Sequence, residues 1–195
     1  MTTQEIPAGQ WSRPLRLLHL LLAIGVTAQL FIGSFMHSPH PGRPDSMGFE
    51  AHEIIGAAVL ALIILHWLWS CSHPNEGLRH LFPWTRQGLR KVVAEFWQGV
   101  RYLRLPPGGP GKDGGLAGLV HGLGLLAITA MVITGGTFYL SRMAGAGRGT
   151  LEIIEDIHDT FAVIVWVYWG GHLGVTVLHS LLRQPVLKRM FSLEN

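Results

Sequence analysis

Four of the eleven histidines in this chain of 195 residues repeat with one spacing. His52 and His66 are 14 residues apart in one apolar segment, and His158 and His172 are 14 residues apart in another. Along a helix, 14 residues return to within about 40° of the starting direction and advance by about 21 Å. Each pair would therefore face one way at two depths. Imidazoles from two facing helices at such depths could hold one haem iron near each side of a membrane.

The two layers of histidines differ in how clearly their members can be assigned. No other helical histidine lies near His52 and His158, so we expect these two to form the outer layer. In the inner layer, His172 has three candidate partners, which are His19, His66 and His121. Depth in the membrane mildly favours His66 and His121, because His19 is only three residues from the charged Arg16. Spacing alone leaves this choice open.

Other ligand chemistries fit the composition less well. The single cysteine, Cys71, excludes an intrachain disulfide, a thiolate zinc cluster and covalent c-type haem attachment, which needs C-x-x-C-H. A histidine-lined path for metal ions or protons is the main alternative, since neutral imidazole binds several transition metals. Buried histidines that only hydrogen-bond to the backbone are another, and they would explain any single one of these residues. His37 and His40 lie in a loop among prolines, where we expect solvated side chains.

Small residues accompany several of these histidines. They would let a flat macrocycle or a second helix approach the backbone. Helix packing alone would also account for them, so they support a cofactor site weakly. The glycines in question are Gly56, Gly122, Gly124, Gly170, Gly171 and Gly174.

The elements that carry the histidines are expected to be membrane helices. Hydrophobic residues make up 48% of the chain and charged residues 14%, with a mean hydropathy of +0.32. Soluble proteins carry about 25% charged residues, and about 20 apolar residues span a bilayer as a helix. Charge-free stretches predict four spans, at about 15–36, 52–70, 116–140 and 157–182. We therefore expect an all-α integral membrane four-helix bundle, with residues 1–195 as a single domain.

The distribution of charge predicts the orientation of this bundle. Twelve Lys and Arg residues lie on the side of the termini and the middle loop, and three lie on the other side, Arg43, Arg142 and Arg148. The positive-inside rule then places both termini in the cytoplasm. Basic residues fall between the apolar runs and form no polar module, so no nucleic-acid partner is expected. The outer side is acidic, which suits either a docking rim for a soluble partner or the capping of helix N-termini.

The middle loop carries its own pattern. Apolar residues recur at helical spacing within residues 86–105, with basic residues on the remaining face, which predicts an amphipathic helix at the membrane surface. The apolar positions are Leu89, Val92, Val93, Phe96, Val100 and Leu103. A Pro-Gly linker at residues 106–111 follows it. The first span is read as a retained anchor, because its apolar stretch exceeds that of a signal peptide.

Taken together, these motifs resemble one known family, the bacterial cytochrome b561 and Ni-hydrogenase b-type cytochrome superfamily. The likeness extends from about Trp11 to Met190, and its most specific part is the histidine pair of the last span. The motifs are Arg16-Leu-Leu-His19-Leu, Glu50-Ala-His52-Glu, Gly118-Leu-Val-His121, and Ile157-His158-Asp159-Thr160 followed by Gly171-His172.

The resemblance implies two non-covalent b haems. Carried onto this chain, it implies that His52 and His158 bind the outer haem and that His19 and His172 bind the inner one. His66 then becomes a packing or neighbouring residue, and His121 has no assigned ligand role. The implied function is electron transfer in the bacterial inner membrane, between the quinone pool and a redox partner subunit or soluble carrier. Whether the chain is a subunit of an oxidoreductase or a stand-alone quinone oxidoreductase stays open, as does a haem-free anchor.

Overall fold

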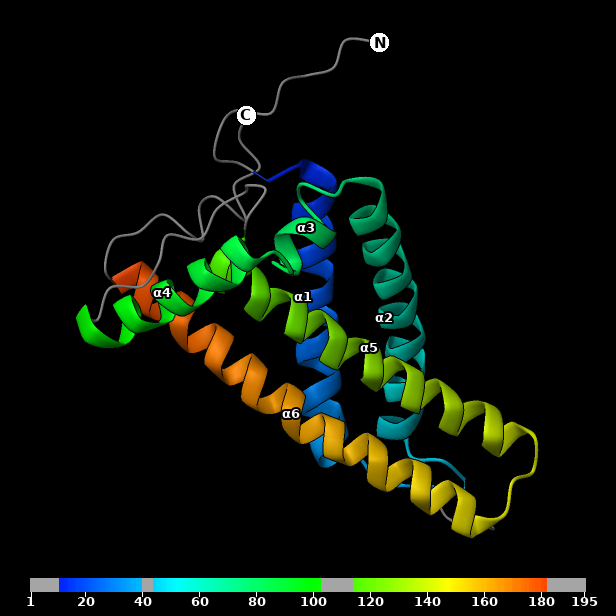
Figure 1. The fold of residues 1–195 in the computed structure, drawn as a ribbon. Coiled ribbons are helices and arrows are strands. Elements are labelled where there is room, and N and C mark those ends of the chain that lie inside the picture. Colours follow the sequence, from blue (N-terminus) through cyan, green and yellow to red (C-terminus); the bar gives the residue numbers. More distant parts are fainter. Residues whose placement is uncertain (1–10, 40–43, 103–113, 182–195) are drawn as a thin grey trace. The chain divides into compact units, whose positions relative to one another are not determined.

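The computed structural model describes residues 11–39, 44–102 and 114–181. These residues form six helices, which Figure 1 shows coloured along the sequence. The helices are α1 (Arg13–Phe35), α2 (Met47–Ser72), α3 (Leu78–Leu81), α4 (Arg86–Tyr102), α5 (Gly115–Met143) and α6 (Arg148–Leu181). The described residues contain no strand, so the predicted all-α class is confirmed.

Four of these helices are long and apolar enough to cross a membrane, namely α1, α2, α5 and α6. They coincide with the four predicted spans, although residue 182 lies outside the described residues. The largest difference is at α6, which begins at Arg148 and not near residue 157. Its first turns are charged and helical, and Arg148 pairs with Glu152 one turn later at 2.7 Å. The predicted cytoplasmic position of both termini stays a prediction.

The chain divides into two compact units, and each long helix contributes one end to each of them. Among the described residues, the first unit contains 11–18, 66–102, 114–124 and 170–181. The second unit contains 19–39, 44–65 and 125–169. The boundary between the units crosses each long helix, near the beginning of α1 and near the end of α2. The prediction of one domain over residues 1–195 stays a prediction.

In the first unit, α3 lies directly on the beginning of α5. A Cβ atom at Gly114 or Gly118 would lie 2.1 Å from the carbonyl oxygen of His80, and one at Gly122 would lie 2.5 Å from that of Leu81. Gly118 and Gly122 are four residues apart and share one face of α5, and Gly114 precedes the helix by one residue. Backbone approaches backbone here, which only residues without a side chain permit.

Carboxylates cap two helices of the first unit. The Ser12 backbone N–H donates to Glu76 Oε1 at 2.9 Å, and the Ser12 hydroxyl donates to Glu76 Oε2 at 2.6 Å, at the start of α1. At the start of α5, the Leu116 N–H donates to Glu95 Oε2 at 2.7 Å. Each carboxylate satisfies backbone donors that have no intrahelical partner, at the end where the helix dipole favours negative charge.

The amphipathic helix predicted at residues 86–105 is present as α4, with residues 103–105 outside the described residues. The apolar side chains on one face of α4 are exposed. They belong to Leu89, Val93, Phe96, Trp97 and Val100. Glu95, which caps α5, lies on the other side of this helix and is half-buried. The contact of the apolar face with a membrane surface stays a prediction.

In the second unit, Arg142 joins the last turn of α5 to the beginning of α2. Its guanidinium donates to both carboxylate oxygens of Asp45, at 2.8 and 2.6 Å, and pairs with Glu53 at 3.6 Å. The guanidinium carbon also lies 5.3 Å from the ring centroid of Phe49.

Aromatic side chains join α1 to α6 in the same unit. The Phe31 ring lies edge-on to Trp166 and Trp169, with centroids 5.4 and 6.0 Å apart. The indole N–H of Trp169 donates to the Thr27 hydroxyl at 2.9 Å. Trp169 therefore has a polar partner inside an apolar helix pair.

The explanation that outer acidic residues cap helix N-termini holds for only one helix. Glu50 lies in the first turn of α2. The first turn of α6 contains no acidic residue, and Glu152, Glu155 and Asp156 lie further along that helix. Capping is therefore wrong for α6, because the dipole acts within the first turn. Glu155 instead accepts a hydrogen bond from the Ser38 hydroxyl.

Replacing Gly118 by alanine tests the contact between α3 and α5. The new Cβ must displace the His80 carbonyl, and we expect G118A to lower the free energy of unfolding by about 1–3 kcal/mol. The matched control is G136A on the same helix, where nothing lies within 4 Å of the added atom. There the higher helix propensity of alanine is expected to leave stability unchanged or raise it by up to about 1 kcal/mol. Denaturant titration in detergent measures both variants, and equal stabilities would contradict the packing described.

Candidate functional site

The second unit brings together the two histidines of the predicted outer layer. His52 of α2 and His158 of α6 lie with ring centroids 6.2 Å apart and ring planes at 83°. Each ring rests on a glycine of a neighbouring helix. A Cβ at Gly33 of α1 would lie 3.3 Å from Cε1 of His52, and a Cβ at Gly135 of α5 would lie 3.3 Å from Cε1 of His158. The Cε1 edges thus face the glycines on both sides.

The hydrogen bonds of His158 identify the nitrogen that is available for a ligand. Its Nδ1 lies 2.8 Å from the Thr134 hydroxyl oxygen. That hydroxyl is also 2.9 Å from the Ala130 carbonyl and 3.0 Å from the Met131 carbonyl, either of which can accept its single proton. With that proton on a carbonyl, the hydroxyl oxygen accepts from Nδ1–H of His158, and the Nε2 lone pair is then the one available for a ligand.

His52 is held through its backbone. The Gln29 side-chain amide donates to the His52 carbonyl oxygen at 2.7 Å. Within the described residues, the buried Nδ1 of His52 has no hydrogen-bond partner. A buried polar atom without a partner is costly in an apolar setting, so Nδ1 of His52 is open to a further polar interaction.

This donor set fits a haem iron. A metal–imidazole bond is about 2 Å long, so two imidazoles on opposite sides of one ion have ring centroids about 6 Å apart. The separation of 6.2 Å between His52 and His158 agrees with that value. The nearby carboxylates of Asp45 and Glu53 are paired with Arg142, which leaves imidazole nitrogens as the available donors. Two neutral imidazoles are an established axial ligand type for haem.

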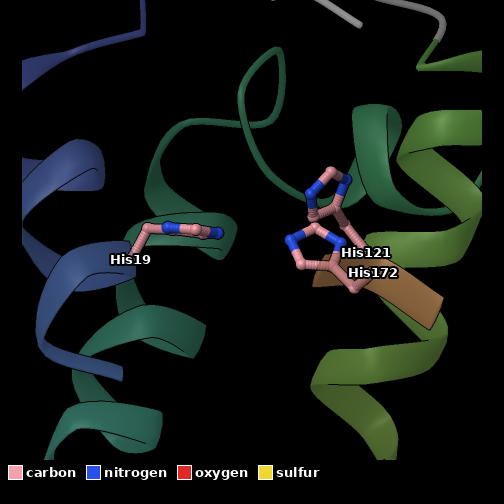
Figure 2. Close-up of side chains that lie close together, drawn as sticks. All are labelled: His19, His121 and His172. Carbon is pink, nitrogen blue, oxygen red and sulfur yellow. The ribbon is translucent and has the colours of Figure 1, made fainter. Parts of the chain in front are cut away.

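The first unit brings together two other predicted histidines, His121 of α5 and His172 of α6 (Figure 2). Their ring centroids are 5.0 Å apart and their planes are at 77°. His121 Nδ1 donates to the Ala117 carbonyl at 2.8 Å, which directs its Nε2 away from its own helix. The centroids are closer than two imidazoles on opposite sides of one metal ion require. The third residue labelled in Figure 2, His19, belongs to α1 and to the second unit.

His66, the remaining candidate for the inner layer, has a partner on its own helix. Its Nδ1 lies 3.3 Å from the hydroxyl of Ser70, one turn further along α2, and Ser70 is fully buried. The packing role that the resemblance implies for His66 stays a prediction. His19 is half-buried in the second turn of α1, and its assignment as a ligand stays a prediction.

The other histidines lie near helix ends or in loops. His80 is buried in α3 and meets the Trp11 ring edge-on at 4.7 Å, and His73 stacks on Trp69 at 3.8 Å. His179 is buried near the end of α6. His37 is exposed after α1, as expected for a solvated side chain. His40 lies outside the described residues.

Several contributors to the outer pair could not be found from spacing. Gly33, Gly135, Thr134 and Gln29 lie on helices other than those that carry the two histidines. The glycine that spacing singled out, Gly56, does not face a ring, since a Cβ there would lie 2.9 Å from the Gln29 amide nitrogen. The only sequence signal was the presence of small and hydroxyl residues in otherwise apolar spans.

Comparison with known proteins gives one match. The family model described as prokaryotic cytochrome b561 matches residues 10–193, which include all four membrane helices and the histidines described above. No curated protein and no solved structure matches the chain. The chain therefore belongs to the prokaryotic cytochrome b561 family, and it is a multi-pass membrane protein of a b-type, haem-binding family of electron-transfer proteins.

Proposed function

We propose that this protein is a dihaem cytochrome b that carries electrons across the bacterial inner membrane. One observation carries the proposal, namely the His52–His158 pair with its 6.2 Å centroid separation. These residues would bind the outer haem through their Nε2 atoms. Attachment would be non-covalent, because the only cysteine, Cys71, lies in no haem-attachment motif. Bound haem supplies a one-electron redox centre, and the protein sets its ligands, surroundings and position.

The inner haem is assigned to His19 and His172 by the family resemblance. One local observation argues against His121 as the second ligand. His121 is 5.0 Å from His172 between centroids, which is too close for the two to bind opposite faces of one haem. His121 is therefore expected to be a neighbour of the inner haem and not a ligand.

The proposed partners follow from the proposed electron transfer. Electrons would pass between the quinone pool and a redox partner subunit or a soluble carrier. The chain would act either as a subunit of an oxidoreductase or as a stand-alone quinone oxidoreductase. The exposed apolar face of α4, with cationic Arg90 and Lys91 on the same helix, suits a cytoplasmic membrane surface rich in anionic lipid. This placement agrees with cytoplasmic termini.

The visible spectrum of the purified protein separates this proposal from the alternatives. We expect a Soret band, a reduced α-band typical of b haem, and two haems per chain by pyridine haemochrome assay. A histidine-lined transporter and a haem-free membrane anchor would both be colourless. A colourless protein purified from haem-sufficient cells would therefore contradict the proposal.

Replacing either outer ligand is expected to remove one haem. H52A and H158A should each reduce the haem content from two per chain to one, because a single imidazole is left at the outer site. H37A, which alters an exposed loop histidine, serves as the control and should retain both haems. Haem content and circular dichroism are measured together. Retention of two haems, or loss of both in a folded variant, would exclude the assignment.

The inner assignment is tested by comparing H19A with H66A. We expect H19A to lose the inner haem and keep the outer one, whereas H66A keeps both, because the resemblance assigns the ligand role to His19 and not to His66. H121A should also keep both haems, with a changed spectrum for one of them. The reverse pattern, with loss of haem in H66A or H121A and none in H19A, would reassign the ligand.

A further inference from the structure

We propose that Thr134 is a positioning residue for His158, and that its hydroxyl holds the imidazole as the Nδ1–H tautomer and lowers the redox potential of the iron bound there. The inference rests on the proposed function, because it concerns the outer haem. Thr134 belongs to α5, a helix to which neither the composition nor the resemblance gives an outer ligand.

The first step is the direction of the hydroxyl proton. The Thr134 hydroxyl lies 2.9 Å from the Ala130 carbonyl and 3.0 Å from the Met131 carbonyl, one turn back in α5. A hydroxyl has one proton, and helix carbonyls accept only. The lone pairs of the oxygen are then the groups that face Nδ1 of His158 at 2.8 Å. The tautomer with its proton on Nδ1 lets the hydroxyl keep its own proton on the helix carbonyls, and it is also the tautomer that a ligand bound at Nε2 requires.

The second step is that the next residue fixes the ring position. A Cβ at Gly135 would lie 3.3 Å from Cε1 and 3.7 Å from Nδ1 of His158. The ring edge that contains Nδ1 therefore lies directly against α5, beside the hydroxyl. Thr134 and Gly135 together supply an acceptor and the space in which the ring reaches it, so Nε2 points away from α5.

The third step is the contrast with the opposite ring. His52 rests on Gly33 in the same way, at 3.3 Å from Cε1 and 3.6 Å from Nδ1. Its Nδ1 has no hydrogen-bond partner among the described residues. The residue beside that glycine, Ser34, is exposed and donates to the Leu30 carbonyl at 2.8 Å. The two rings thus differ in hydrogen bonding at Nδ1, and with Nδ1–H donated to an acceptor His158 would be the more electron-rich ligand.

This difference has a direct consequence for bound iron. An acceptor on the N–H of a ligand histidine raises the basicity of the metal-bound nitrogen. A more basic ligand stabilises ferric iron relative to ferrous iron, so the hydrogen bond lowers the midpoint potential. Removal of the hydroxyl should raise the midpoint potential of the outer haem and leave that of the inner haem unchanged.

The test replaces Thr134 by valine, which has the same shape and lacks the hydroxyl. At the wild-type midpoint of the outer haem, T134V should favour the reduced form by several-fold and up to about tenfold, where tenfold equals about 59 mV for a one-electron couple. The g-values of the corresponding low-spin ferric signal should change as well. T134S keeps the hydroxyl and should behave as wild type. T137V is the matched control, because Thr137 is exposed and, among the residues that the structure describes, its hydroxyl donates to the Ile133 carbonyl of its own helix at 2.7 Å.

Each outcome decides the proposal. A shift of one haem in T134V, with T134S and T137V unchanged, supports it, and so does selective loss of the outer haem in T134V that T134S restores. A wild-type potential and ferric signal in T134V would overturn it. An equal shift in T134S would also overturn it, since the effect would then come from packing. If the wild-type protein contains no haem, the proposed function itself is wrong. That result is obtained before any variant is compared, so it is distinct from a failure of the proposal for Thr134.

Discussion

An imidazole ring inside a membrane helix has two nitrogens and few groups that can satisfy them. In hydrocarbon, an unpaired polar atom has no water to replace its missing partner. His158 meets this constraint through Thr134, and His121 meets it through the Ala117 carbonyl. In both residues the protein engages Nδ1. For His158 the proposed division of the ring, with Nδ1 for the protein and Nε2 for a ligand, is what a metal-binding histidine requires.

Glycine determines where such rings can lie. Gly33 and Gly135 each leave space for the Cε1 edge of a histidine on another helix. In the first unit, Gly118 and Gly122 do something different, since they admit the backbone carbonyls of His80 and Leu81. The same residue type therefore serves a ring contact in one place and a backbone contact in the other. Counting glycines near a histidine in the sequence cannot separate these uses.

The membrane spans were predictable because charge is excluded from lipid, so the charge-free stretches mark the helices. The start of α6 at Arg148 was not, because a helix that continues into water can carry charged residues such as Glu152 and still form its hydrogen bonds. The meeting of His52 with His158 followed from helical spacing. Thr134 did not follow, because the residue of a third helix that meets a ring depends on the rotation of that helix about its axis. Spacing within one helix contains no information about that rotation.

The order of two neighbouring residues explains why the rings of His52 and His158 differ in hydrogen bonding at Nδ1. On α5 the hydroxyl residue Thr134 precedes Gly135, and on α1 the hydroxyl residue Ser34 follows Gly33. Successive residues in a helix are rotated by about 100°, so the two hydroxyls lie on opposite sides of their glycines when viewed along the chain. Only the first order places a hydroxyl on the ring nitrogen, while in the second the serine is exposed and bonds to its own helix. Two similar dipeptides thus provide equal space for a ring but an unequal hydrogen bond, and this gives the two ligands of one proposed haem different electronic character.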